Sequence, residues 1–507
     1  YPHMEHKMKK LFGFIIGLTI IAAIMAGIGV GAFHWSGSLA KESFEKSIML
    51  TTGDQAITYN VVNFNKDLFI STAEAKLTID PEKLNSGVNT QVIPIDKPIS
   101  VKLKHTIYHG PFAFKAPEFD PTKPVAAFIN TKVIIDSNPE LKALTTALWG
   151  SQNPFKINST VSFSGLVETA LEIAPIDTTT PKGLTVKWTG AKSMVAHNIE
   201  TNSFSSAMDA GGITFEEGKE WALIDGIKIQ ASGSFGEGNL LNSSFGYTVE
   251  KAVLEAEKRG KLIKGDLKNI AIKAGNKVEG KELSSFLSIS LDNLNFDGQK
   301  YGPGEINLGL NKIDAEAAIS MQKQLEAAKA DAAKQGLPPE TAMFIAQQKL
   351  MENLPKLLQQ GPEIEISKLE VQTPQGKVKG QSKIALNLGG KPVPANPMEM
   401  IPMISINTNI SVPTALVEST LATLAKKDIK RDLRMSGEPV TPEKVNEMAN
   451  NMVKSQIEAI AAQNLIKIEG ESITGSYRMK QGRVNINGIE IPIEQFIGSL
   501  MQGQAPK

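Results

Sequence analysis

The sequence contains no cysteine, which excludes disulfides, thiolate metal sites and a cysteine nucleophile. Histidine is scarce as well, with six residues in a chain of 507. Charge of either sign is not in excess, because 54 basic and 53 acidic residues leave a formal net charge of +1. No basic stripe interleaved with aromatic residues occurs, so we expect no nucleic-acid partner. Burial of apolar side chains and pairing of strands must hold the fold together.

The motifs of common catalytic sites are also missing. No strand-to-helix elbow of the type Gly-x-Ser-x-Gly is present, and Gly302-Pro303-Gly304 reads as a turn rather than a phosphate-binding loop. His105 and His109 would lie about 13 Å apart on a strand, too far to share one metal ion. We interpret His105 as a histidine of the core. The sequence therefore predicts no enzyme, no cofactor and no metal site, and a hydrolase is the last of the functional hypotheses.

One long apolar run, residues 11–33, follows Lys7, Lys9 and Lys10. At about 1.5 Å per residue, a helix of this length crosses a hydrocarbon core about 30 Å thick. The preceding lysines place residues 1–10 in the cytoplasm and export the remainder of the chain. The alternative is a signal peptide cleaved after Ala32, but signal peptides carry shorter apolar regions of about 7 to 15 residues. The run thus predicts a single, uncleaved membrane anchor.

Four glycines of this run stand in two Gly-x-x-x-Gly pairs: Gly13 with Gly17, and Gly27 with Gly31. Small residues on one helix face let two membrane helices approach closely, which favours association of anchors. Glycine is also common in membrane helices generally, so the pairs agree equally well with an anchor that packs against nothing.

The exported body is predicted to be mostly β (α+β), with residues 34–50 as a stalk helix. Apolar and polar residues alternate over 101–108, 287–291 and 404–412, which is typical of half-buried strands. Frequent turn dipeptides, such as Asn487-Gly488, separate such segments. We expect a large curved antiparallel β-sheet, or meander, with amphipathic helices docked on it. Residues 51–310 would form a β-rich region and residues 311–507 an α+β region.

Four helices are expected in the carboxy-terminal half. Asp314 can cap the first, which extends to about Lys334, and Pro338-Pro339 opens the second. The third covers residues 415–424. Thr441-Pro442-Glu443 starts the fourth, with Val445, Met448 and Met452 facing inward. Three short strands over 465–491 and a terminal helix over 493–500 complete the prediction.

Three short motifs resemble the YdgA-like family of anchored bacterial envelope proteins. The first is Tyr108-His109-Gly110-Pro111-Phe112, which closes a strand. The second is Phe64, Phe69 and Ser71, where Asp67 stands in place of the family's glycine. The third runs from Asn487-Gly488 to Phe496. The resemblance implies an inner-membrane anchor, a periplasmic β-rich body and a Gram-negative source, and it brings no known activity. We interpret His109-Gly110-Pro111 as a structural turn after which Phe112 returns to the core.

Two functional hypotheses follow from these patterns. The first is a non-enzymatic structural or assembly role in the cell envelope, with self-association through sheet edges and the anchor. The second is binding or transfer of a lipid, or of another hydrophobic ligand, in a groove of the sheet. The expected location is the bacterial inner membrane, with a single pass and the body in the periplasm. The partners to consider are the membrane, a second copy of the chain and a lipid.

Overall fold

The computed structural model describes residues 57–80, 98–120, 122, 124–135, 139–180, 183–235, 241–258, 261–335, 339–394 and 396–496. The predicted anchor (11–33) and stalk helix (34–50) lie outside these residues. Within the described part of the chain, no helix is long and apolar enough to cross a membrane. The chain divides into two compact units: unit 1 is Tyr1–Gly236 with Asn242–Asp266, and unit 2 is Glu237–Leu241 with Leu267–Lys507.

Unit 1 is built from two antiparallel ladders of strands. The first ladder runs, in spatial order, through β1 (Ile57–Asn65), β2 (Ile70–Ile79), β3 (Ile99–His109), β4 (Ala127–Ile134), β5 (Phe155–Val161), β6 (Leu166–Ile173), β9 (Ala191–Asn198), β10 (Ser203–Asp209) and β13 (Lys228–Phe235). The second comprises β7 (Ile176–Thr179), β8 (Thr185–Trp188), β11 (Ile213–Glu217), β12 (Glu220–Asp225) and β14 (Leu241–Lys258).

The alternation of buried and exposed residues along these strands produces one dense core in unit 1. In β3, for example, Val101, Leu103, His105 and Ile107 are buried while Lys102 and Lys104 are exposed. Side chains from both ladders meet in this core, which explains why each strand buries one face. Two short helices accompany the strands: η2 (Gly110–Lys115) and α4 (Pro139–Trp149).

Unit 2 contains a second run of antiparallel strands. Their spatial order is β16 (Glu282–Phe296), β18 (Gly304–Asp314), β19 (Glu363–Thr373), β20 (Gly376–Leu386), β21 (Ile404–Pro413) and β23 (Ser472–Lys480). Strand β17 (Gln299–Tyr301) pairs with β16, and β22 (Lys467–Glu469) and β24 (Arg483–Ile486) pair with β23. β25 (Ile489–Pro492) pairs with β24, and β15 (Lys261–Glu279) spans the division between the units.

The helices of unit 2 follow from local signals in the sequence. Helix α5 (Ala315–Lys334) begins at Asp314, whose carboxylate accepts a hydrogen bond from the Ala317 N–H at 2.9 Å. Helix α9 (Pro442–Ala462) begins at Thr441 in the same way. The remaining helices of unit 2 in the described residues are α6 (Pro339–Leu357), α7 (Pro397–Met400), η4 (Ile401–Met403) and α8 (Thr414–Met435).

The structure confirms a mostly β chain with a large antiparallel sheet and accompanying helices. No curl of the sheet is detected among the described residues, so the predicted curvature stays a prediction. The proposed division after residue 310 likewise stays a prediction. Met448 and Met452 are 41% and 46% exposed, so their predicted inward orientation is wrong. The four positions that α9 buries are Val445, Ala449, Val453 and Ile457, which follow the 3.6-residue helical period.

Smaller differences concern the ends of elements. Helix α8 continues eleven residues beyond the predicted end at Leu424, to Met435. Helix α4 was not predicted. The segment expected as one strand over 483–491 is the hairpin β24–β25, because Asn487-Gly488 forms a turn with positive φ at both residues. Of the predicted terminal helix, residues 493–496 are helical and 497–500 lie outside the described residues.

Candidate functional site

Two of the sequence motifs meet in unit 1, where β2 begins and β3 ends. The Ser71 Oγ lies 2.7 Å from His109 Nε2, although the two residues are 38 positions apart. The same hydroxyl accepts a hydrogen bond from the Asp67 N–H at 3.1 Å, and the His109 N–H donates to the Phe69 carbonyl at 3.0 Å. We call this arrangement the Ser71–His109 clip. It ties the β1–β2 turn to the end of β3.

The rest of the Tyr108–Phe112 motif forms the start of the β3–β4 connection. Gly110 has φ of +48°, and its N–H donates to the Ala126 carbonyl at 2.7 Å, which closes the turn. Pro111 occupies the first turn of η2, where its missing N–H costs no hydrogen bond. The ring of Tyr108 lies 6.4 Å from that of Phe128. The side chains of Pro111 and Phe112 lie outside the described set, as do Gly13, Gly17, Gly27 and Gly31.

The clip has the features of a structural junction. Ser71 is fully buried, and its hydroxyl is engaged by Asp67 as well as by His109. Desolvation lowers the pKa of His109, and the nearby Lys66 lowers it further, while Asp67 acts in the opposite direction. Asp67 itself does not have a positive φ, so the turn needs no glycine at this position. The lowered pKa of His109 and the fully hydrogen-bonded Ser71 hydroxyl agree with a structural contact rather than a catalytic one.

Replacing Ser71 by alanine should therefore destabilise unit 1. The change leaves the Asp67 N–H and the His109 ring without the partner that they share. Because Asp67 is exposed and His109 only partly buried, water can replace that partner in part, and we expect a loss of about 1 kcal/mol. Chemical denaturation followed by circular dichroism would measure the loss. Ser164→Ala, at an exposed turn, serves as the control and should change the free energy of unfolding by less than about 0.5 kcal/mol. Equal stabilities of the two variants would contradict the role of the clip.

His105 lies four residues before His109 on the same face of β3, and it confirms the interpretation as a core histidine. It is 1% exposed, with Nε2 3.1 Å from the Tyr59 hydroxyl and Nδ1 2.9 Å from Thr131 Oγ1. Burial lowers the pKa of His105 to about 4 and raises that of Tyr59 above its usual range. Both ring nitrogens are satisfied within the protein. Across the described ranges, no group of three or more histidine, aspartate or glutamate residues is placed to hold a metal ion.

The most distinctive surface of the described chain is one face of the unit 2 sheet. Cross-strand pairing places aliphatic side chains in rows that run from β16 to β23. One row contains Leu310, Ile364, Ile384, Ile406 and Met479, and the next but one contains Ile289, Ile306, Leu369, Gly380 and Ile410. We call this surface the aliphatic face.

The aliphatic face is largely open to solvent in its central strands. Ile364 is 56% exposed, Ile384 41% and Ile410 39%. Leu308 and Leu310 on β18 are similarly exposed, at 39% and 40%. A chain of ordinary globular design would cover such rows, because each large aliphatic side chain gains about 1.5–3 kcal/mol on full burial. Extended apolar patches that stay exposed mark binding surfaces.

A shallow hollow of about 320 Å³ lies over β19, β20 and β21. Its lining includes the polar residues Lys368, Glu370 and Lys379 as well as Leu369 and Ile410. The Leu369 side chain occupies the space beside Gly380. The polar side chains that occur on this face are paired with each other or with the backbone. Ser382 Oγ and Thr408 Oγ1 are 2.7 Å apart, and the Tyr477 hydroxyl donates to the Leu465 carbonyl at 2.6 Å. The aliphatic face thus offers apolar contact area but few free hydrogen-bonding groups that could recognise a ligand.

The opposite face of the same strands is charged. Lys368 pairs with Glu305 at 2.6 Å, Lys377 with Glu370 at 2.9 Å, and Glu363 with both Lys312 and Lys383 at 2.7 Å. Hydrogen bonds from these lysines, first that of Lys312, hold the pKa of Glu363 below its usual value. The sheet therefore presents one charged face, suited to water, and one aliphatic face.

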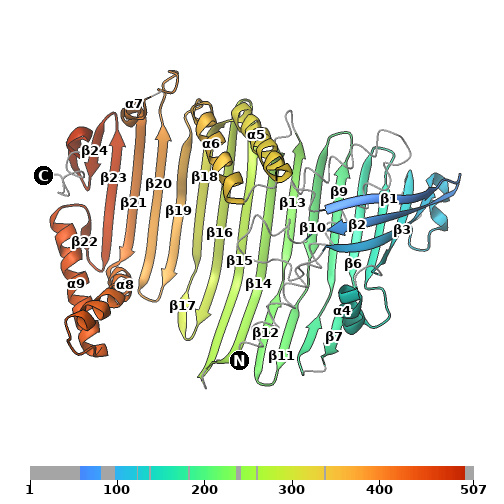
Figure 1. Cartoon of the computed structure of the whole chain (residues 1–507), viewed down its shortest axis with the longest axis horizontal. Helices are drawn as coiled ribbons and strands as arrows, with labels where there is room; N and C mark the ends of the chain where they lie inside the picture. The colour runs from blue at the N-terminus through green and yellow to red at the C-terminus, as the bar shows by residue number, and fades with distance from the viewer. Residues whose placement is uncertain are drawn as a thin grey trace. The chain divides into compact units, whose positions relative to one another are not determined.

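Helices cover the aliphatic face only at its borders. Helices α8 and α9 pack together on Ile473, which belongs to this face of β23. Figure 1 shows α5 and α6 lying across β16 and β18. In this view no helix crosses the middle of β19, β20 or β21, although α8 contacts β21 near its end. The open part of the aliphatic face therefore consists of β19, β20 and β21, and helices lie next to it on both sides.

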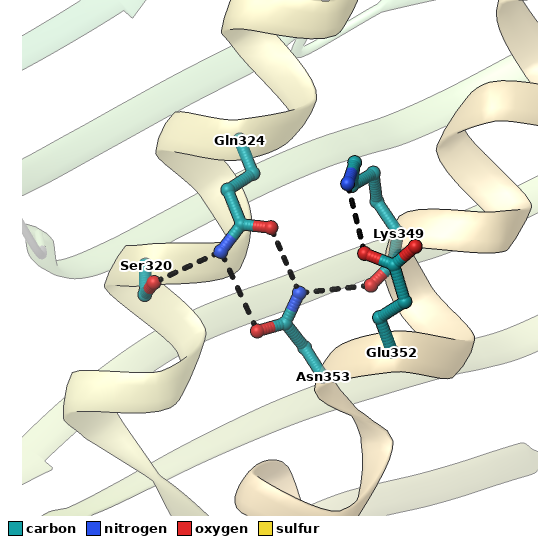
Figure 2. Close-up of polar contacts among 5 residues, drawn as sticks. All are labelled: Ser320, Gln324, Lys349, Glu352 and Asn353. Carbon is teal, nitrogen blue, oxygen red and sulfur yellow. Dashed lines mark hydrogen bonds and ion pairs between the residues drawn. The ribbon is translucent and has the colours of Figure 1, made fainter.

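Helices α5 and α6 are joined to each other by polar side chains, as Figure 2 shows. The buried Asn353 amide donates to Gln324 Oε1 at 3.1 Å and to the Lys349 carbonyl at 2.9 Å. The Gln324 amide in turn donates to Ser320 Oγ at 3.1 Å. Where the hairpin meets the sheet, Gln360 donates to the Asp314 carboxylate at 2.9 Å, which links its two ends. The hairpin is thus a defined unit at the border of the aliphatic face.

Sequence reasoning did not find the open aliphatic face. The alternating patterns of 287–291 and 404–412 identify one apolar face on each strand, and such a face is normally covered. The signal that was present is the extent of the pattern, since six paired strands share the apolar face. The sequence does not show which part of that face the helices cover.

Comparison with known proteins places these features in a family. The model of the family described as "Bacterial protein of unknown function (DUF945)" matches residues 8–494. Protein YdgA of Escherichia coli (strain K12) is 23% identical over 470 residues, which cover 86% of this chain and 89% of the relative. No solved structure matches. The resemblance found in the three short motifs is thereby confirmed, and the chain belongs to this family of bacterial proteins of unknown function.

Proposed function

We propose that unit 2 binds the acyl chains of a lipid on its aliphatic face. The observation that carries the proposal is the exposure of two rows of aliphatic side chains on β18–β21, with helices at the borders of these strands. Each methylene group that leaves water for such a surface contributes about 0.8 kcal/mol. A saturated chain laid along these rows would therefore gain several kcal/mol without any directional contact.

The dimensions of the face suit an acyl chain. The strands β19, β20 and β21, spaced about 4.8 Å apart, occupy a width of about 14 Å. An acyl chain within one leaflet extends over about half of a hydrocarbon core of about 30 Å.

The chemistry of the face favours a lipid over a protein partner. Protein interfaces carry about one hydrogen bond per 100–200 Å² together with polar residues at the rim. The hydroxyls of Ser382, Thr408 and Tyr477 are already engaged within the chain. Aliphatic side chains dominate the rows, with aromatic anchors nearly absent, whereas aromatic residues and arginine dominate the binding energy of protein interfaces.

The location proposed for this activity is the periplasm, with residues 11–33 anchoring the chain in the inner membrane. This position would set the aliphatic face beside a lipid source. The role is then a non-enzymatic one, carriage or shielding of lipid. Self-association as an assembly component, the first hypothesis from the sequence, would instead use the sheet edges and the anchor.

Introducing a carboxylate at the centre of the face should release the lipid. Ile384→Glu places a charge in the row of Leu310 and Ile364, and a charge that an acyl chain covers is costly to desolvate. We expect the lipid retained per protein, measured by native mass spectrometry after extraction in mild detergent, to fall about tenfold. This factor corresponds to about 1.4 kcal/mol.

The matched control is Asn407→Glu, on the neighbouring strand but on the charged face, opposite Lys383. It adds the same charge and should leave lipid retention unchanged. Lipid-free wild-type protein, or a dimer that dissociates on Ile384→Glu, would contradict the proposal; the second result would assign the face to a second copy.

A further inference from the structure

A second set of exposed apolar side chains lies in unit 1, at one end of its strands. Leu68 is 78% exposed, Phe69 41%, Phe114 61% and Phe163 73%. We call these four residues the apolar tip. They occupy turns and the short helix η2 rather than a sheet face, because the faces of these strands supply the core. Exposed phenylalanines grouped on turns require an explanation other than packing.

Backbone pairing places the four residues along one edge. The β1–β2 turn, with Leu68 and Phe69, is bonded to the end of β3 through the His109 N–H and the Phe69 carbonyl. The next link is Gly110 N–H to the Ala126 carbonyl at 2.7 Å, followed by Ala126 N–H to the Val161 carbonyl at 2.7 Å. Phe163 sits in the turn directly after β5. The apolar tip therefore follows the ends of β1 to β6 in order.

We propose that the apolar tip of unit 1 inserts into the surface of a phospholipid bilayer. This inference goes beyond lipid binding on the aliphatic face and stands independently of it. Each phenylalanine gains about 1.5–3 kcal/mol on leaving water, so three of them and a leucine give a useful membrane affinity. Polar and charged residues flank these side chains: Ser162 and Ser164 lie beside Phe163, Lys66 and Asp67 precede Leu68, and Lys115 follows Phe114.

The spacing of the prongs favours a bilayer over a protein partner. A stable protein interface buries about 800 Å² on each partner as a continuous patch. Single apolar side chains separated by serines and lysines do not form such a patch. A fluid bilayer accepts separate prongs, and lysines at its surface are attracted to anionic headgroups at about 1 kcal/mol each.

The Ser71–His109 clip holds part of the apolar tip in place. It fixes the turn carrying Leu68 and Phe69 to the strand that leads into η2 and Phe114. A rigid tip loses less conformational entropy on insertion than a mobile loop. The clip thus pre-organises Leu68, Phe69 and Phe114 for insertion. The sequence motifs around Ser71 and His109 therefore support the apolar tip.

The segment between the predicted anchor and β1 is long enough for the tip to reach the membrane. Twenty-three residues separate Phe33 from Ile57, where β1 begins. With the predicted stalk helix over 34–50 and residues 51–56 extended, this segment reaches about 45 Å. Strand β1 needs only about 30 Å to run from its start to the turn that carries the tip. A chain anchored through residues 11–33 can therefore bring the tip to the same bilayer.

The absence of cysteine makes a depth measurement direct. Phe114→Cys and Phe163→Cys each introduce a single thiol at an exposed site in the full chain, which can be labelled with an environment-sensitive fluorophore. The labelled protein is reconstituted in vesicles of phosphatidylcholine and phosphatidylglycerol that carry a lipid-borne quencher in the acyl region. Gln152→Cys, exposed at the other end of β5, is the matched control.

We expect quenching at positions 114 and 163 to be at least twofold stronger than at position 152. In the Phe163→Cys background, the further change Phe114→Ser should weaken the quenching at position 163, since it removes one prong. Equal quenching at all three positions, or none at 114 and 163, would overturn the proposal. Loss of lipid from the aliphatic face would leave this result unaltered.

Discussion

Lowering the pH from 6.5 to 4 is expected to reduce the free energy of unfolding of unit 1 by about 3 kcal/mol through His105. Burial between Tyr59 and Thr131 lowers the pKa of this imidazole to about 4, whereas the unfolded chain has the ordinary value of 6.5. Between these values the unfolded state binds a proton that the folded state does not. Stability is therefore complete above about pH 6.5 and is lost progressively as the pH falls towards 4.

Denaturant unfolding at several pH values between 7 and 4 measures this loss. His105→Gln removes the titrating group, so the variant should show a shallower pH dependence even if its stability at pH 7 is lower. His109 acts in the same direction, because its pKa is also lowered, and His109→Gln separates the two contributions. A pH dependence that persists unchanged in His105→Gln would contradict the assignment.

Replacing Gly190 by alanine is expected to destabilise unit 1 by about 4 kcal/mol. Gly190 lies between β8 and β9 with φ of +90°, a conformation that costs other residues about 1–2 kcal/mol. A Cβ there would also meet the Ile173 carbonyl oxygen at 2.4 Å and the Pro175 nitrogen at 3.2 Å. Both are backbone atoms of a neighbouring segment, so relief requires movement of the core, at a further cost of about 1–3 kcal/mol.

Gly183→Ala is the matched control for this prediction. Gly183 has φ of +84°, but no atom lies within 4 Å of the position that its Cβ would take. The control should thus show the conformational cost alone, about 1–2 kcal/mol. Thermal and chemical denaturation of both variants measures the difference. If the two variants were equally stable, the close approach of the Gly190 backbone to Ile173 would be wrong.

Much of the fold could be predicted from local patterns. The alternation around Val101 and Leu103 identified β3, and the alternation around Ile406 identified β21. The caps at Asp314 and Thr441 gave the starts of α5 and α9, since a side-chain acceptor followed by an apolar stripe is a local signal. These features depend on residues within one turn or one strand of each other.

The parts that escaped prediction depend on long-range contacts. The Ser71–His109 clip joins residues 38 positions apart, and no local pattern reports the register of β2 against β3 that creates it. Similarly, the sequence marks Ile384 as apolar but does not reveal whether a helix covers it. Met448 and Met452 were assigned to the core because methionine is apolar, although the α8–α9 contact uses Val445 and Ala449 instead.

Acyl chains bound on the aliphatic face of unit 2 would lie within reach of a covalent label. Photo-crosslinking of the full chain with a phospholipid that carries a diazirine in its acyl chain tests this binding most directly, with the modified residues mapped by peptide mass spectrometry. We expect label on β19, β20 and β21 at positions such as Ile364, Ile384 and Ile410. Label confined to residues 11–33, or distributed equally over the charged face at Lys379 and Asn407, would contradict the proposal.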